Sequence, residues 1–334
     1  MQKLYERFQS RRYRENGLLE VSQLQAELIE ESALNFPFLV LIVSSCAIAT
    51  FGLLANSTAV IIGAMIIAPL MMPIRGLAFG ALKGHPYLFR QGLISLFVGT
   101  VVALAIAWVL GRVVGLSNFG SEVMARSEPT LLDLGVAVAA GGISAYAKFQ
   151  PKIAGSLAGT AIAVALMPPI CVIGLGLSQA NWSLSWGATL LYLTNLFGIA
   201  LSCMLVFLLA GYAPYHRARK ALLWTLAFTS ALVIPLGFSL ARLVEQAQLE
   251  LKIDEALRNR TTTFQRIELV DTTVNWLQNP PEVRLYVRAK EPITPYQVAL
   301  LEQFLTREMG RPFELIFVVG QVEEIRSSDL EAEG

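Results

Sequence analysis

The sequence predicts an α-helical polytopic membrane protein built from two inverted three-helix repeats with Pro-broken helices, a seventh helix and a small α/β soluble domain. Three observations carry this prediction. Hydrophobic residues make up 54% of the 334 residues and charged residues only 15%, whereas a soluble chain carries roughly a quarter charged residues. Several apolar runs are long enough to cross a bilayer, which takes roughly 17–25 residues each. Two of these runs repeat one another.

The repeated runs are residues 58–80 and 154–176, which align at an offset of 96 positions. The identical pairs include Gly63 and Gly159, Leu70 and Leu166, Met71 and Met167, Pro73 and Pro169, Ile74 and Ile170, and Gly80 and Gly176. Proline lacks an amide donor and clashes with the carbonyl four residues back, so each run predicts a kinked or broken helix. Broken helices at matching places in two halves are typical of a transport site. The alternative is two Pro-kinked packing helices left by an old duplication.

The apolar runs divide the chain into three regions. They lie at about 37–55, 58–74, 92–116, 131–147, 153–177, 186–211 and 221–243. The first three and the next three form the repeats, about 37–116 and 131–211, and the last run is an extra helix. Because three crossings place the copy on the opposite side, the repeats are predicted to be inverted. If the broken segments are re-entrant, the repeats are parallel instead.

The distribution of basic residues predicts the orientation. With seven crossings and a cytoplasmic N-terminus, thirteen Lys and Arg lie on the inner side, against Arg112 and Arg126 outside. Inner loops of membrane proteins are rich in Lys and Arg, so this topology is favoured. Parity then places the C-terminal domain outside, although long tails do not follow the charge rule.

The transmembrane domain is predicted to span residues 36–244, and the regions on either side of it are polar. Residues 1–35 carry no apparent cleavable signal and place Leu18, Val21, Leu24 and Leu28 at helical spacing. This pattern predicts an amphipathic helix on the cytoplasmic membrane face or against a neighbouring subunit. Residues 1–244 hold 16 basic and 9 acidic residues, whereas residues 245–334 hold 10 and 16. The acidic tail argues against nucleic acid as a partner.

The tail predicts a β-β-α-β domain. Val283, Leu285 and Val287 alternate with polar residues, which is typical of a half-buried strand. A helix is predicted to start at a Thr294 cap and to stop at Gly310 before a third strand. Residues 321–334 are predicted to be disordered. Because fewer than 80 ordered residues bury only a modest core, the domain is expected to depend on subunit or membrane-domain contacts.

Polar residues in the apolar regions are the candidates for a substrate or ion pathway. Asn56, Ser57 and Thr58 fit either a helix N-cap or an ion contact at a helix N-terminus. Asn195 fits either a structural hydrogen bond between helices or a pore lining, and Arg75 either snorkels or guards the pathway mouth. The candidate set is Asn56, Ser57, Thr58, Met71, Pro73, Arg75, Thr160, Met167, Pro169 and Asn195.

Other residues argue against several classes of chemistry. Cys46, Cys171 and Cys203 lie in apolar segments with no metal or disulfide spacing, so neither a metal nor a cofactor is expected. No acidic residue lies deep in an apolar run, which disfavours carboxylate-based ion coupling. His85 and His216 lie in loops, out of reach of the Ser144 region, and no catalytic motif is present. The protein is therefore not expected to be an enzyme.

The segments NSTAVIIGAMIIAPLMMPI (56–74) and GTAIAVALMPPICVIG (159–174) resemble a known family. They are similar to the bacterial and archaeal membrane proteins known as an uncharacterised hydrophobic domain, the domain of unknown function family three-eight-nine. The resemblance covers about residues 36–211 and implies a multi-pass protein of a prokaryotic inner or plasma membrane. It implies no substrate and no functional residue. Many relatives place a soluble domain before the membrane part, whereas here it follows.

Two hypotheses for the function follow. The first is a membrane transport protein, either channel or carrier, for an unidentified ion or small solute, with its pathway at the two broken segments. The second is a non-transporting sensor or scaffold, whose C-terminal domain binds a ligand or partner. In both, the lipid bilayer is a partner. Small residues at four-residue spacing, such as Gly76, Gly80 and Gly84, predict a homo-oligomer.

Overall fold

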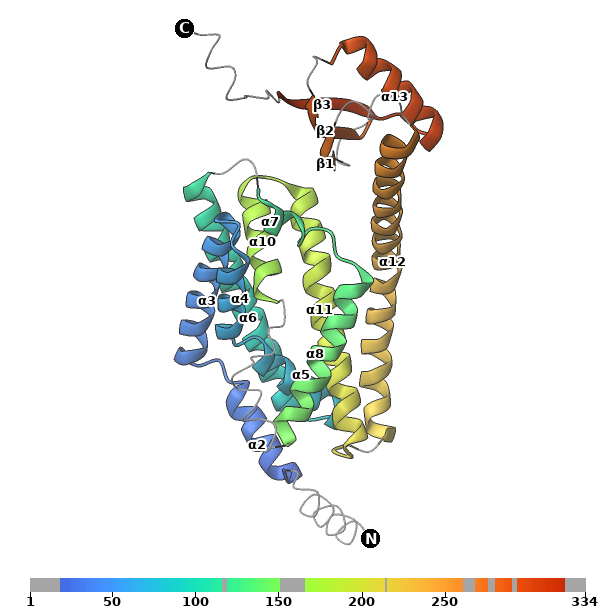
Figure 1. Cartoon of the computed structure of the whole chain (residues 1–334). Helices are drawn as coiled ribbons and strands as arrows, with labels where there is room; N and C mark the ends of the chain where they lie inside the picture. The colour runs from blue at the N-terminus through green and yellow to red at the C-terminus, as the bar shows by residue number, and fades with distance from the viewer. Residues whose placement is uncertain are drawn as a thin grey trace, which may run out of the picture. The chain divides into compact units, whose positions relative to one another are not determined.

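The computed structural model describes residues 19–115, 119–150, 166–213, 215–260, 268–275, 280–289 and 293–321. The chain divides into two compact units, Met1–Leu240 and Ala241–Gly334, which are shown together in Figure 1 and described separately here. Three sequence predictions lie outside the described residues: the helix position of Leu18, the pathway residue Thr160 and the disordered end beyond Gln321.

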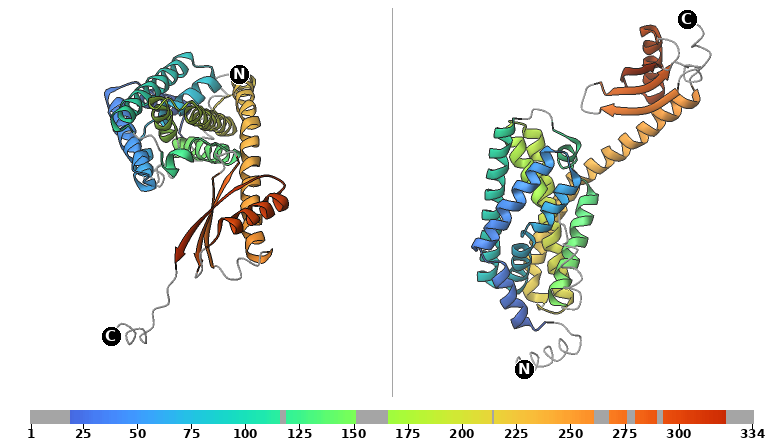
Figure 2. Two further views of the ribbon diagram at one scale, coloured as in Figure 1. Left: turned by 90° about the horizontal axis from the view of Figure 1, so that it is seen from above. Right: turned by 60° about the vertical axis from the view of Figure 1, so that its left-hand side comes forward.

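The first unit is a bundle of helices (Figures 1 and 2). The helices that begin in it are α2 (Val21–Glu31), α3 (Phe36–Leu54), α4 (Thr58–Ile67), α5 (Met71–Lys83), α6 (Pro86–Val114), α7 (Ser121–Met124), α8 (Leu131–Phe149), α10 (Met167–Ser178), α11 (Trp182–Leu209) and α12 (Tyr215–Arg260). Helix α12 is continuous across the boundary between the units. Its internal Pro235 does not end it.

Several of these helices are long and apolar enough to cross a membrane. Five qualify on their own, α3, α6, α8, α11 and α12 over Ala218–Ile253, and the bent pair α4 and α5 makes a sixth. Helix α10 is apolar but has only 12 residues. Large apolar side chains are exposed on the bundle surface, with Phe97 68% and Val113 78% exposed. A surface of this kind is compatible with a multi-pass membrane protein.

Hydrogen bonds define two ends of the bundle. At one, here called the α2 end, the Leu19 amide donates to the Phe149 carbonyl at 3.1 Å and the Tyr212 hydroxyl donates to the Leu19 carbonyl at 2.8 Å. At the other, the α7 end, the Glu122 amide donates to Asn56 Oδ1 at 2.9 Å. Helix α3 therefore runs from the α2 end to the α7 end, and α8 runs in the opposite direction (Figure 1).

The bundle is organised around α6 and α11. Helices α5 and α10 each pack against both of them, while α3 packs on α6 and α8 packs on α11. Glycines allow close approach: a Cβ on Gly92 of α6 would lie 2.7 Å from the Pro73 carbonyl oxygen of α5. A Cβ on Gly141 of α8 would lie 2.7 Å from Ile199 Cα of α11. Gly80, one of the small residues predicted to form an oligomer interface, is likewise used within the chain, since a Cβ on it would lie 2.6 Å from the Phe89 amide nitrogen of α6.

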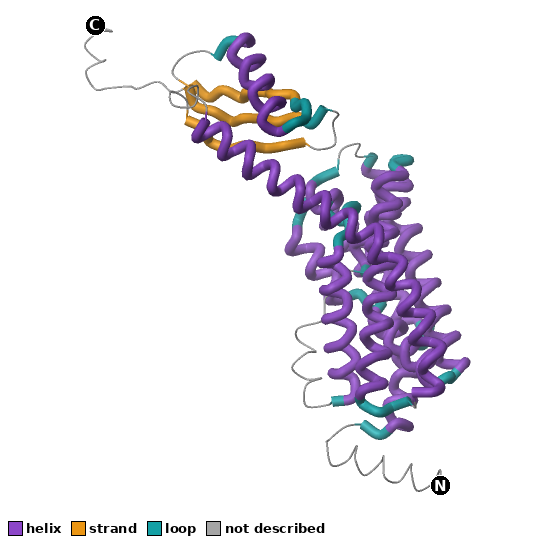
Figure 3. Tube along the Cα trace, turned by 90° about the vertical axis from the view of Figure 1, so that its right-hand side faces the viewer, coloured by secondary structure: helices purple, strands orange, loops and turns teal. Residues whose placement is uncertain are grey.

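The second unit contains the predicted β-β-α-β order, with β1 (Glu268–Asn275), β2 (Glu282–Ala289), α13 (Pro295–Met309) and β3 (Glu314–Gln321). The sheet order is β1-β2-β3, with β1 antiparallel and β3 parallel to β2. Helix α13 and the end of α12 pack on the sheet (Figure 3). Thr294 and Gln297 form a capping box, and Gly310 ends the helix with φ of 72°, because glycine adopts this conformation without strain.

Candidate functional site

The most distinctive feature of the bundle is the break between α4 and α5. Helix α4 ends at Ile67, α5 begins at Met71, and the two helices are bent by 49°. Pro69 lies in the break and Pro73 in the first turn of α5, where a missing amide costs no intrahelical bond. The sequence prediction of a break in this segment is therefore confirmed, and the prolines account for its position.

The second predicted break involves α10. Its counterpart of α4 lies among residues 151–165, which are outside the described residues. Helix α10 itself begins at Met167 with two successive prolines, Pro168 and Pro169. All of its residues except Leu177 are buried. A helix start enclosed by protein in this way places its first amide groups away from water.

The helices that surround these segments place the candidate residues at three levels. Met71 is half-buried, while Pro73 and Pro169 are buried. Asn195 is 4% exposed on α11, the helix against which both α5 and α10 pack. These side chains lie within the bundle, whereas Asn56, Ser57 and Thr58 lie at the α7 end and Arg75 near the α2 end. Helix α10 also contacts α3 and α4. Because α4 belongs to the first broken segment and α10 to the second, the two segments are in contact.

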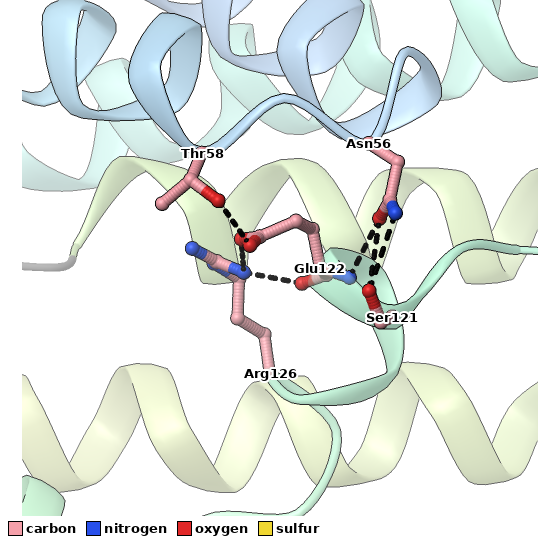
Figure 4. Close-up of polar contacts among 5 residues, drawn as sticks. All are labelled: Asn56, Thr58, Ser121, Glu122 and Arg126. Atoms are coloured by element: carbon pink, nitrogen blue, oxygen red, sulfur yellow. Dashed lines mark hydrogen bonds and ion pairs between the residues drawn. The ribbon is translucent and has the colours of Figure 1, made fainter. Parts of the chain in front are cut away.

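Asn56 and Thr58 join two loops at the α7 end (Figure 4). The Asn56 side chain accepts the Glu122 amide at 2.9 Å and donates to Ser121 Oγ at 3.2 Å, so it caps the short helix α7. Thr58 donates to the Glu122 carboxylate, which also pairs with Arg126 at 2.8 Å. Ser57 occupies the N-cap position of α4 without a side-chain cap bond. The prediction that Asn56 or Ser57 caps the first broken helix is therefore wrong, because Ser57 makes no side-chain cap bond on α4 and Asn56 caps α7 instead.

The backbone and electrostatics of this contact have clear causes. Asn56 has φ of 51°, a conformation that asparagine tolerates better than most residues. The hydrogen bond from Thr58, followed by the hydrogen bond from Arg126, lowers the pKa of Glu122 below its usual range. The carboxylate is thus held in its charged form between α4 and the α7 segment.

A second polar cluster lies at the α2 end and was not foreseen from the sequence. Arg75 donates to Glu31 at 3.2 Å, and Lys148 pairs with Glu31 at 2.9 Å and also with Glu27. Beside these pairs, Ser95 Oγ donates to the Ser32 carbonyl at 2.6 Å. The four-residue spacing of Glu27 and Glu31 puts both on one helix face; it could have indicated a shared cation but not which one.

Two of the three cysteines meet across the bundle. Cys46 of α3 and Cys171 of α10 lie with their sulfur atoms 3.6 Å apart, and both are free thiols. Cys46 also donates to the Ala103 carbonyl of α6 at 3.0 Å. The sequence spacing of 125 residues gave no sign of this contact. Within the described residues, no group of three His, Cys, Asp or Glu side chains is arranged to hold a metal.

Comparisons with known proteins identify a family domain within the chain. The family model described as Domain of unknown function (DUF389) matches residues 65–201, from within α4 to within α11. An uncharacterised protein of the archaeon Methanocaldococcus jannaschii is 26% identical over 225 residues, which cover 64% of this chain and 69% of that protein. No solved structure matches the chain significantly. Residues 65–201 therefore form a domain of the family described as Domain of unknown function (DUF389).

Proposed function

We propose that this protein is a membrane transport protein, a channel or a carrier, for an ion or small solute. The observation that carries the proposal is the break at Ala68–Leu70, which interrupts an apolar segment inside the bundle. Interrupted helices at membrane depth are tolerated where protein or a water-filled cavity surrounds the freed backbone groups. In transporters such helix ends commonly form the substrate site.

The positions of the helices support an internal duplication. Corresponding helices start 95 or 96 positions apart: α3 and α8 at residues 36 and 131, α5 and α10 at 71 and 167, α6 and α11 at 86 and 182. The helix caps also correspond, since His85 accepts the Leu88 amide and Asn181 accepts the Leu184 amide. Because α3 and α8 run in opposite directions, we propose that the two repeats are inverted.

The chemistry of the proposed site is that of helix ends. The last carbonyls of α4 carry partial negative charge, and the first turns of α5 and α10 carry partial positive charge. The amides at these helix starts include those of Met71 and Met167, whereas Pro73, Pro168 and Pro169 have none. A small ion or solute at the breaks would bind these backbone groups instead of a carboxylate. We assign the interior of the pathway to Met71, Pro73, Met167, Pro169 and Asn195, and from the sequence alone also to Thr160, which lies outside the described residues. Asn56, Ser57 and Thr58 would lie at one mouth and Arg75 at the other.

Electrical recording tests this proposal. The full chain is inserted into a planar bilayer under a salt gradient and compared with Asn195→Ala and with a control, Ala139→Ser, at an exposed position of α8. Discrete current steps whose conductance changes in Asn195→Ala but not in the control would support a channel. For a carrier, solute uptake into vesicles replaces the current. Silence in both assays, with folded and inserted protein, would contradict transport of the solutes supplied.

The rival function, a sensor or scaffold, draws on one observation. The second unit has a hydrophobic core of its own, which includes Leu285, Leu305 and Phe313. A separately folded domain after the membrane part is a ready place for a ligand or partner. In that case a ligand binds the second unit and no solute crosses the membrane. A cytoplasmic N-terminus, an outer C-terminal domain and homo-oligomerisation remain proposals under either function.

A further inference from the structure

An open apolar groove of about 600 Å³ lies in the first unit, between α5, α6, α11 and α12. Its walls include Leu77, Phe89, Leu96, Met204 and Trp224. Helix α12 is joined to α11 beside it by stacked rings of Phe197 and Phe228, with centroids 5.3 Å apart. The volume lies within the range of about 300–1,000 Å³ that holds small molecules.

The groove has almost no polar lining. Of the lining residues, only His85, Thr225 and the indole N–H of Trp224 offer polar side-chain groups. His85 Nδ1 accepts the Leu88 amide at 3.2 Å, and Thr225 Oγ1 donates to the Ala221 carbonyl at 2.9 Å. These groups are engaged within the chain, so the walls favour a hydrocarbon over a polar solute. The groove is therefore separate from the pathway proposed above.

The length of the groove matches one leaflet of a bilayer. It extends along α6 from Pro86 to Leu96, ten residues that rise about 15 Å at 1.5 Å per residue. The hydrocarbon core of a bilayer is about 30 Å thick, so one leaflet contributes about half of that. The groove begins at the α2 end, where Gly84 and Ala221 line it, and it reaches the middle of the bundle.

The end of the groove at Gly84 and Ala221 is flanked by basic residues. Lys83 directly precedes Gly84, and Lys220 directly precedes Ala221. The Lys83 ammonium also donates to Gln25 of α2 at 3.1 Å. Residues 83–96 and 214–228 contain no acidic residue. Of the acidic residues of α2, Glu27 pairs with Lys148, and Glu31 pairs with Arg75 and Lys148. A phosphate headgroup at this end would meet positive charge.

We propose that the groove binds one anionic phospholipid, with an acyl chain between α6, α11 and α12 and its headgroup at the end flanked by Lys83 and Lys220. The acyl chain would cover the exposed faces of Phe89, Trp224 and Phe228. In a bilayer these faces would otherwise contact bulk lipid. This binding is independent of the transport proposal, because the groove shares no residue with the assigned pathway.

Native mass spectrometry of the full chain in detergent tests the proposal. Phosphatidylglycerol and phosphatidylcholine with the same acyl chains are added in turn. The expected result is one retained lipid per chain, with phosphatidylglycerol preferred. Ala81→Phe fills the groove and should abolish retention, whereas Ala105→Phe, at an exposed position of α6 outside the groove, should not. Lys220→Gln should weaken the preference about fivefold, and Lys252→Gln on the same helix should leave it unchanged.

Other outcomes would overturn the proposal. Equal retention of the two lipids, or retention unaffected by Ala81→Phe, would show that no specific lipid site exists. Loss of a dimer with Ala81→Phe, without loss of lipid, would assign the groove to a second copy of the chain. If Ala81→Phe does not fold, quenching of Trp224 by bromine-labelled acyl chains decides. The Trp224 signal is the difference in fluorescence between the wild type and Trp224→Phe. The proposal then requires that phosphatidylglycerol quench this signal at about fivefold lower mole fraction than phosphatidylcholine does. Equal quenching by both lipids would refute it.

Discussion

Arg75 of α5 donates to Glu31 of α2 at 3.2 Å, so the helix that follows the first break is tied to the amphipathic helix before the bundle. Lys148 of α8 binds the same carboxylate at 2.9 Å. Glu31 thereby connects α2 to both α5 and α8. Leu24 and Leu28 are fully buried beneath these pairs, so α2 is held by both charge and apolar packing.

Glu31→Gln is expected to loosen α2. The substitution leaves Arg75 and Lys148 without their shared charge, and their side chains are only 15% and 11% exposed. The cost should be about 1–3 kcal/mol, between the values for exposed and buried pairs. Hydrogen exchange of the α2 amides measures it. Glu30→Gln, at an exposed position of the same helix, serves as the control, and equal exchange in the two variants would argue against the role of these pairs.

Asn56→Ala is expected to free α7. It removes the bonds to Ser121 and to the Glu122 amide and places alanine at φ of 51°. The loss of the cap and the strained backbone should cost about 1–3 kcal/mol together. Ser57→Ala should have almost no effect, because Ser57 makes no side-chain cap bond. Thermal unfolding of both variants checks this; a larger loss in Ser57→Ala would reverse the assignment of the cap.

The same contact should depend on pH. Hydrogen bonds from Thr58 and Arg126 lower the pKa of Glu122 in the folded chain. A lowered folded pKa means that the carboxylate stabilises the fold at pH values above its unfolded pKa, and that this stability is lost as pH falls through the folded pKa. The protection of the α7 amides, measured as their exchange rate relative to that of an unfolded chain at the same pH, should therefore fall on acidification in the wild type. In Glu122→Gln this dependence should be much smaller; an unchanged dependence would point to another group.

Gly92→Ala is expected to disturb the packing of α6 on α5. The added Cβ would lie 2.7 Å from the Pro73 carbonyl oxygen and 2.9 Å from the Leu77 amide nitrogen, so the backbones must separate. Overpacking of this kind costs about 1–3 kcal/mol. Gly135→Ala on α8 meets nothing within 4 Å and should stabilise the helix by about 0.5–1 kcal/mol. Opposite shifts in melting temperature are predicted, and a stabilised Gly92→Ala would contradict the close approach.

Local signals in the sequence predicted the local structure well. The helix is interrupted near Pro69 and Pro73 as predicted, and α13 begins after Thr294 and ends before Gly310 as predicted. Such signals are readable because caps and helix breakers act within a few residues. Of the predicted apolar face of α2, Leu24 and Leu28 are buried while Val21 is half-buried. These features depend on periodicity and backbone chemistry, which one sequence contains in full.

Features that depend on packing between distant helices were missed. Nothing near Cys46 indicated that Cys171 lies 3.6 Å away, and nothing near Arg75 indicated Glu31 as its partner. Asn56 was recognised as a cap residue, but the helix it caps begins 65 residues later, at Ser121. One sequence cannot specify such pairs, because each residue type is compatible with many partners until the helices are placed.

The central claim, a solute pathway at the breaks, is tested most directly by water access. The three native cysteines are replaced, and Ala68→Cys and Met71→Cys, both at half-buried positions of the break, are treated in vesicles with a membrane-impermeant thiol reagent. We expect both to be labelled and a transported solute to slow the labelling, whereas Ala105→Cys on the outer face of α6 stays unlabelled. Absence of labelling at both break positions, while the exposed Asn56→Cys reacts, would contradict the pathway.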